Sequence, residues 1–363
     1  MPVMEMKILQ NIELFKSLYE NIVLDESGSQ VKIYDSIPDE YHSLSHGVGM
    51  RDISGAGIIE LFGKESLDFL HRLSTNDLKN LEKDYARGTI FTNEKGRIID
   101  RALVVNFGEK QLLLSSRVFK NKLLSWLNKY IIMEDIRTAD AIGRYSVLEF
   151  IGPQTESFLS FIFGKEIDYL GFDTLKYIEI ERVRFNLLKI KEGNQIKIII
   201  ISHAAESEFL IKYMFEQNNI FDFRPVGEHA YSLFRIMKAI PAAPGEINDK
   251  YNPIETGLLS DISFKKGCYI GQEVIARLDT YDKVQRYLKA ITFEDFADIQ
   301  DEVILQSGDI QVGEVTSCAK LPGRNKTVGL AYIKKEFAEE GSRLIAIDKE
   351  GKTYQVIVSN MHI

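Results

Sequence analysis

The sequence predicts an α+β protein in which a duplicated strand–helix–hairpin core precedes a small antiparallel β-barrel. Apolar runs at strand and helix spacing follow one another twice in the same order, and the residues after 285 form short strand-like runs separated by turns. We therefore expect a core domain of two lobes at 1–285 and a barrel domain at 286–363. No Pro- or Gly-rich linker separates them, so we expect the domains to pack together.

The first round of the duplication follows a helix expected at 5–24. Ile58-Ile59-Glu60-Leu61-Phe62 suits a strand, and the turn residues Asn93 to Gly96 indicate a hairpin. The elements expected in order are a strand at 58–62, a helix at 64–74, a hairpin within 88–105, a strand at 111–116 and a helix at 119–131.

The second round repeats this order, although the two halves share no evident residue-level identity. Pro153 suits the first position of a helix. The elements expected are a strand at 144–152, a helix at 153–163, strands at 183–190 and 196–202, and a helix at 206–218. Six strand-like runs from about residue 287 onward then predict the barrel.

The charge balance excludes broad classes of partner. Lys and Arg number 45 against 53 Asp and Glu, a formal net charge of −8. An acidic chain gains little general attraction from nucleic acid, so direct nucleic-acid binding is not expected. The most apolar run, at 198–201, is far shorter than the roughly 20 residues of a membrane span, and the first residues contain no apolar signal core. We expect a cytoplasmic protein without membrane contact.

The two cysteines, Cys268 and Cys318, are too few for a disulfide framework or a self-contained four-cysteine metal site. Cys268 lies in a Gly-flanked turn before an expected helix start, with Lys265 and Lys266 close in sequence. Such surroundings favour the thiolate, which can attack, be oxidised or ligate iron. A small buried cysteine beside turn glycines is the alternative interpretation. Cys318 is interpreted as a core residue of a strand.

Several motifs in 234–278 carry a resemblance to a known family. They are RIxxxIP at 235–241, GEI at 245–247, NPIETGL at 252–258 and, most specific, KGCYIGQE at 266–273. This segment resembles the YgfZ group of folate-binding proteins, a branch of the superfamily of the glycine-cleavage T-protein (aminomethyltransferase). Looser similarity, including FLHRLSTNDL at 69–78 and NEKGRIID at 93–100, extends over most of the chain. The resemblance implies a three-lobed T-protein-like arrangement around a folate channel.

The resemblance also implies a function. YgfZ-type proteins are implicated in assembly or maintenance of iron–sulfur clusters and, through cluster enzymes, in tRNA modification. The implied role here is a folate-binding accessory factor acting through the Cys268 thiol, more a non-catalytic or weakly catalytic relative than an enzyme. Its ligands would be tetrahydrofolate or a related folate and a cluster shared with iron–sulfur client or assembly proteins, with Cys268 as one cluster ligand. The motif residues that would support the thiol are Lys266, Gly267, Tyr269, Gly271, Gln272 and Glu273.

The sequence departs from the T-protein pattern at three places. An adjacent acidic pair is usual after the KGG strand, whereas this chain has Asp100 followed by Arg101. The T-protein GYTGExGxE segment is missing, and the usual R-x-E becomes Arg235-Ile236-Met237. Because a guanidinium cannot replace a carboxylate that stabilises a cationic centre, these departures argue against aminomethyl transfer.

Four residues remain candidates for folate contact: Asp100, Arg101, Arg235 and Glu255. The guanidinium fork of Arg235 suits a ligand carboxylate. Each candidate has a plainer interpretation, since Arg235 could form a surface ion pair, Glu255 could cap a turn and Asp100 could be a solvated acid. The alternative function is a folate-dependent one-carbon transferase of the aminomethyltransferase or demethylase type, favoured by the retained Asp100. A third interpretation is a binding module that has lost both chemistry and ligand.

Overall fold

The computed structural model describes residues 3–218, 220–280, 283–297 and 303–359, with the backbone alone for 3–10. The chain forms two compact units, each discontinuous in sequence. Unit 1 comprises Met1–Leu67, Asn80–Arg87 and Leu103–Tyr231, and unit 2 comprises Asp68–Lys79, Gly88–Ala102 and Ser232–Ile363.

Unit 1 contains a six-stranded sheet with the order β10-β11-β12-β9-β3-β13. Its pairings are antiparallel except that of β13 with β3, which is parallel. The strands are β10 (Leu175–Ile180), β11 (Val183–Glu192), β12 (Gln195–His203), β9 (Tyr145–Ile151), β3 (Val48–Asp52) and β13 (Phe223–Pro225).

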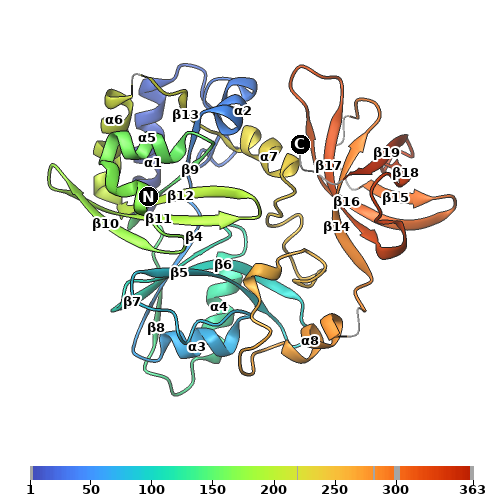
Figure 1. Cartoon of the computed structure of the whole chain (residues 1–363), viewed down its shortest axis with the longest axis horizontal. Coiled ribbons are helices and arrows are strands. Elements are labelled where there is room, and N and C mark those ends of the chain that lie inside the picture. Colours follow the sequence, from blue (N-terminus) through green and yellow to red (C-terminus); the bar gives the residue numbers. More distant parts are fainter. Residues whose placement is uncertain (1–2, 219, 281–282, 298–302, 360–363) are drawn as a thin grey trace. The chain divides into compact units, whose positions relative to one another are not determined.

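Helices cover one face of this sheet (Figure 1): α1 (Val3–Leu18), α5 (Thr155–Phe163) and α6 (Ser207–Gln217). Alternate residues of β9 and β12, such as Phe150 and Ile200, point to these helices and pack with Phe15 and Phe158 in one buried cluster. This alternation is what a strand buried on both faces requires.

A second sheet has the order β5-β6-β7-β4-β8 and packs against the other face, where Val147 and Ile199 meet Ile58 and Leu112. Each sheet thus has three consecutive strands followed by the strand that opens the round, which confirms the predicted duplication. The elements are β4 (Gly57–Phe62), α3 (Ser66–Leu73), β5 (Tyr85–Thr92), β6 (Ile98–Asn106), β7 (Lys110–Ser115), α4 (Lys120–Tyr130) and β8 (Arg137–Asp140).

Unit 2 contains the closed antiparallel barrel predicted from the sequence, with the order β14-β17-β16-β15-β18-β19. Its strands, orange to red in Figure 1, surround a core that includes Phe293, Leu305 and Ile333. They are β14 (Arg286–Phe293), β15 (Val303–Ser307), β16 (Ile310–Lys320), β17 (Thr327–Lys334), β18 (Arg343–Ile347) and β19 (Thr353–Ser359).

Unit 2 also contains residues 88–102, where β5 and β6 form the predicted hairpin. Most of α7 (Glu228–Met237), all of α8 (Gln272–Thr280) and the short η3 (Leu259–Asp261) belong to it as well. The other elements of the chain are β1 (Val23–Leu24), β2 (Val31–Ile33), α2 (Ile37–His46), η1 (Lys165–Tyr169), η2 (Ala204–Glu206) and η4 (Lys335–Phe337). No helix in the described ranges is long and apolar enough to cross a membrane.

The structure departs from the sequence predictions at α1 and β10, among other elements. The helix expected at 5–24 ends at Leu18. Tyr19 and Ile22 pack against the core from chain that is no longer helical, and their spacing in the sequence extended the predicted helix beyond its real end. β10 was not predicted; only Ile178 among its residues is buried, so the strand carries little hydrophobic pattern.

A buried ionic ladder crosses three strands of the six-stranded sheet. Glu149 accepts hydrogen bonds from Lys197 Nζ at 2.9 Å and Arg51 Nη1 at 2.5 Å, and the Arg51 guanidinium lies 3.2 Å from the ring centroid of Tyr231. Burial alone would raise the pKa of Glu149, but Lys197 and Arg51 lower it below its usual value. All three groups are therefore charged in the folded protein.

We predict that Glu149→Gln lowers the free energy of unfolding of unit 1 by about 3–5 kcal/mol, because two buried cations lose the carboxylate they share and keep only Glu192 and Glu228 as charged partners. The chain has a single tryptophan, Trp126 in α4, so its fluorescence during urea unfolding reports on unit 1. Lys212→Ala is the control; it breaks the exposed pair with Glu208 in α6 and should cost about 0.3–0.5 kcal/mol. Equal effects of the two variants would contradict the prediction.

Candidate functional site

Most of the predicted site residues lie in the long segment between α7 and α8 or on the hairpin at 88–102, within unit 2. Apart from η3, residues 238–271 have no regular structure, yet the stretch from Tyr251 to Thr256 is buried. Buried irregular backbone needs polar partners. Those partners are the Asn252 and Glu255 side chains of the segment itself and backbone N–H groups of the hairpin and the barrel, from Ile98 and Leu288. Charged side chains of the hairpin and the barrel add further anchors.

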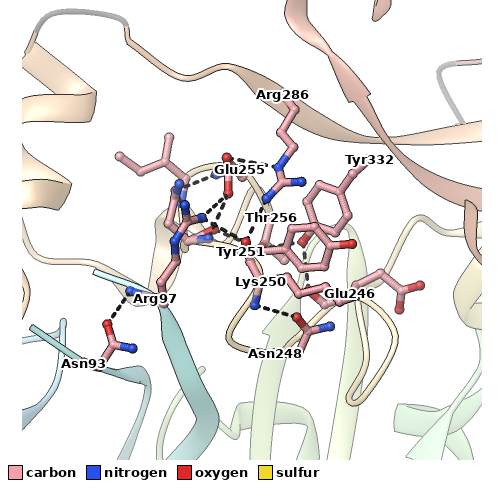
Figure 2. Close-up of polar contacts among 12 residues, drawn as sticks. Asn93, Arg97, Glu246, Asn248, Lys250, Tyr251, Glu255, Thr256, Arg286 and Tyr332 are labelled. Atoms are coloured by element: carbon pink, nitrogen blue, oxygen red, sulfur yellow. Dashed lines mark hydrogen bonds and ion pairs between the residues drawn. The ribbon is translucent and has the colours of Figure 1, made fainter. Parts of the chain in front are cut away.

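Glu255 is the first such anchor (Figure 2). Its carboxylate accepts from Arg97 Nη1 at 3.3 Å and from Arg286 Nε at 3.2 Å, and both arginines also donate to the carbonyl oxygen of Lys250. The backbone N–H of Asn252 donates to the same carboxylate at 3.0 Å. Glu255 therefore ties the hairpin and the start of the barrel to one loop, and the protein itself occupies both of its oxygens.

Two tyrosines stack beside this anchor. The rings of Tyr251 and Tyr332 lie 3.5 Å apart at 16°, and the guanidinium of Arg286 lies 4.6 Å from the Tyr251 centroid. Tyr251 donates to Glu314 at 2.6 Å, and Tyr332 donates to the carbonyl oxygen of Glu246 at 2.8 Å. Burial raises the pKa of both phenols well above the usual value, so they remain neutral donors.

Arg235, expected as a ligand for a folate carboxylate, is buried near the end of α7. Its guanidinium donates to Glu246 at 3.0 Å and to Ser317 at 2.8 Å. Glu246 is fully buried and also accepts from the hydroxyls of Thr316 and Ser317, each at 2.6 Å. Arg235 therefore forms a buried ion pair, not a surface one, and its guanidinium is bonded to the protein's own side chains. The GEI motif at 245–247 marks this segment in the sequence, but nothing local to it predicts that Glu246 is the partner of Arg235.

Asp100 and Arg101 lie on β6. Asp100 is fully buried, and its Oδ1 accepts from the backbone N–H of Arg101 at 2.9 Å. Arg101 Nε donates to Asp261 at 2.6 Å, and Asp261 is itself buried. A Cβ at Gly88 would lie 2.6 Å from Asp261 Oδ1, so a side chain at position 88 would force that carboxylate to shift. The charge reversal at Arg101 is thus neutralised by Asp261, which the sequence did not reveal.

The Cys268 loop connects η3 to α8. Gly267 and Cys268 are exposed, whereas Tyr269 is buried with Ile262 and Ile275. Burial raises the pKa of Tyr269 to about 12. Gln272 begins α8, and the exposed Glu273 lies in its first turn, as the sequence predicts.

The side chain of Lys266 is hydrogen-bonded to the backbone. Its ammonium donates to the carbonyl oxygens of His71, Ser74 and Asn76. Burial lowers the pKa of Lys266 to about 8, against the opposing effect of Asp77. Three carbonyl acceptors favour the charged form of this side chain.

Cys318 lies on β16, partly buried and packed against the barrel core, which agrees with its interpretation as a core residue. Burial, followed by the negative charge of Glu246, raises the pKa of its thiol to about 12. Within the described part of the chain, no three or more His, Cys, Asp or Glu side chains gather where they could hold a metal ion. These residues therefore do not fit an iron–sulfur cluster unless another chain supplies ligands.

Comparison with known proteins places this geometry in a family. The family model for the GCVT N-terminal domain matches residues 16–266, and the model for the glycine cleavage T-protein C-terminal barrel domain matches residues 290–363. The chain belongs to the glycine-cleavage T-protein family.

Similarity to individual proteins supports this family assignment. The chain is 24% identical over 349 residues to an aminomethyltransferase of Pseudothermotoga lettingae, covering 94% of this chain and 95% of the relative. It is 27% identical over 322 residues to a chloroplastic protein of Arabidopsis thaliana that carries a provisional transferase name, covering 86% and 71%. The crystal structure of aminomethyltransferase T of the glycine cleavage system from Bartonella henselae superposes with a TM-score of 0.80 at 17% identity, covering 96% and 95%.

The T-protein-like fold expected from the resemblance is thus confirmed, and the relatives in sequence and fold include aminomethyltransferases. The two matched ranges leave residues 267–289 between them, and Cys268 lies in that interval. The family model therefore covers the Asp100 and Arg235 regions but ends just before the thiol.

We predict that iodoacetamide labels Cys268 at least ~100-fold faster than Cys318 at about pH 8. A thiol with a pKa of about 12 is ionised in only about one molecule in 10⁴ at that pH, and only the thiolate reacts. Peptide mapping by mass spectrometry measures both rates. Cys268→Ser should remove the fast phase, and urea-unfolded protein should label both sites at similar rates. Comparable rates in the folded protein would contradict the prediction.

Proposed function

We propose that the protein binds tetrahydrofolate or a related folate and transfers a one-carbon unit to it from an amine donor. The carbon–nitrogen bond of the donor would break and a carbon–nitrogen bond to the folate would form. The folate nitrogen would lose its proton, and the donor nitrogen would take up one proton and leave as the free amine. Support comes from near full-length similarity to aminomethyltransferases in sequence and fold. The observation that carries the proposal is the buried carboxylate of Asp100, oriented by the backbone N–H of Arg101.

The neighbouring charges favour this chemistry more than the sequence alone suggested. Arg101 would repel a cationic centre, but its guanidinium is paired with Asp261 at 2.6 Å. A paired guanidinium adds little net positive charge beside Asp100. Asp100 would then serve as the carboxylate that stabilises the cationic reacting centre or moves its proton.

We predict that Asp100→Asn lowers one-carbon transfer to tetrahydrofolate by about 10²-fold or more, since a positioned acid–base group contributes about that factor. The amide keeps an oxygen acceptor for the N–H of Arg101, so the fold and the calorimetric affinity for tetrahydrofolate should change little. A panel of aminomethyl and methylamine donors tests turnover, with the exposed Asp309→Asn as control. Absence of saturable tetrahydrofolate binding to the wild type would contradict the proposal, as would full turnover by Asp100→Asn.

A second candidate function is a YgfZ-type accessory role in iron–sulfur cluster assembly or maintenance, and in tRNA modification that depends on it. The exposure of Cys268 within KGCYIGQE favours this candidate, because a purely structural cysteine is usually buried. A shared cluster would require thiolates from a client or assembly protein. The Cys268 thiol would be the contributing group of this chain.

We predict for this candidate that Cys268→Ser fails to restore iron–sulfur enzyme activity in cells that lack the native gene. Cys318→Ser should restore it, because that thiol is partly buried in the barrel. Immunoblotting must show equal amounts of both variants. Full complementation by Cys268→Ser would exclude the thiol as the functional group, while transferase activity retained by that variant would leave the first proposal standing.

A further inference from the structure

The Cys268 loop supplies the cap for the C-terminal end of α3. The last four carbonyls of a helix lack partners within the helix. At the end of α3, the carbonyl oxygen of His71 accepts a hydrogen bond from the ammonium of Lys266. The carbonyl oxygen of Arg72 accepts one from the backbone N–H of Ile270 at 3.3 Å. Both donors come from residues that flank Cys268 by two positions.

Further contacts hold the loop on both sides of the thiol. The ammonium of Lys266 also donates to the carbonyl oxygens of Ser74 at 2.7 Å and Asn76 at 2.8 Å, so all three of its protons have acceptors. Upstream, the backbone N–H of Ser263 donates to the carbonyl oxygen of Thr75 at 3.0 Å. Charge-assisted hydrogen bonds of this kind are stronger than neutral ones, and a cation is favoured at a helix C-terminus.

The downstream side of the loop is held by the hairpin. Thr92 donates to the carbonyl oxygen of Ile270 at 2.7 Å. Gly271 has a φ of +85°, and a Cβ there would lie 2.6 Å from the carbonyl oxygen of Asn93. Between these attachments Gly267 has no atom within 4 Å of its Cβ position, and Cys268 is exposed. The thiol therefore lies at the free part of a loop that is fixed on both sides.

We propose that Lys266 is a positioning residue for Cys268: its ammonium, held by three backbone carbonyls, fixes the loop at 264–271 on the end of α3 and so presents the thiol in one place. The inference rests on the second candidate function for its biological meaning, but the attachment itself can be measured without it. Lys266 then acts through backbone geometry, in contrast to the sequence-based expectation that its charge favours the thiolate.

The test is hydrogen–deuterium exchange of the loop in the full-length protein, comparing Lys266→Ala with Lys265→Ala. Lys265 is the exposed neighbour and serves as the matched control. We expect the amides of Ser263 and Ile270 to exchange at least ~10-fold faster in Lys266→Ala and at the wild-type rate in Lys265→Ala. Lys266→Met, which keeps the aliphatic stem, provides a second variant if the alanine variant folds poorly.

Chemical rescue distinguishes an ammonium held by carbonyls from simple loss of side-chain packing. Methylammonium has N–H donors and should slow exchange in Lys266→Ala toward the wild-type rate, whereas tetramethylammonium at the same ionic strength should not. Wild-type exchange in both Lys266 variants, or equal effects of the two ammonium ions, would overturn the proposal.

The functional consequence is tested separately by complementation. Lys266→Ala should reduce the activity that depends on Cys268 and should have no further effect in a Cys268→Ser background. If Cys268→Ser complements fully while exchange in Lys266→Ala is still faster, the accessory function fails and the positioning of the loop stands. If Cys268→Ser fails to complement while Lys266→Ala complements fully, the thiol is functional and the positioning role is overturned.

Discussion

The requirement that buried charge be paired organises the second unit. Three of its acidic residues, Glu246, Glu255 and Asp261, are at most 6% exposed, and the carboxylate of each accepts a hydrogen bond from at least one arginine. A lone buried carboxylate costs several kcal/mol, whereas a paired and hydrogen-bonded one is tolerated. The segment between α7 and α8 therefore has a defined path although η3 is its only regular element in the described structure, because each of these carboxylates must meet an arginine.

This constraint explains how an irregular segment can support a functional group. Glu255 joins the segment to the hairpin and to the first barrel strand, and Asp261 joins it again to the hairpin only six residues later. The Cys268 loop begins just beyond Asp261. A loop attached this closely to a rigid hairpin has little freedom, which is the condition for presenting one side chain in a constant geometry.

Local patterns predicted the repeated elements, whereas the pairings that build the site could not be predicted. Strands such as 196–202 and the turn at 93–96 follow from apolar runs and turn residues, and the duplication follows from their order. Arg97 and Glu255 are 158 residues apart, and Arg101 and Asp261 are 160 apart, so no local pattern connects them. Closeness in sequence was also a poor guide to contact. Lys266 is two residues from Cys268, yet its ammonium is bound by the carbonyl oxygens of residues 71, 74 and 76.

The departures from the T-protein pattern share one physical outcome. At position 101 the resemblance implies an acid, whereas this chain has an arginine, and that cation is bound by Asp261 from the segment that leads into the Cys268 loop. At Arg235 the guanidinium is likewise bound by a protein carboxylate, Glu246. Releasing either arginine to a ligand would leave a buried carboxylate without its cationic partner, which is costly. Charges that a ligand could have used thus serve as internal attachments. The pair of Arg101 with Asp261 fixes the segment to the hairpin that carries Asp100, whereas the pair of Arg235 with Glu246 is bonded to β16 of the barrel. The same hairpin contacts Ile270 and Gly271 beside the thiol, so the buried carboxylate of Asp100 and the exposed cysteine depend on one scaffold.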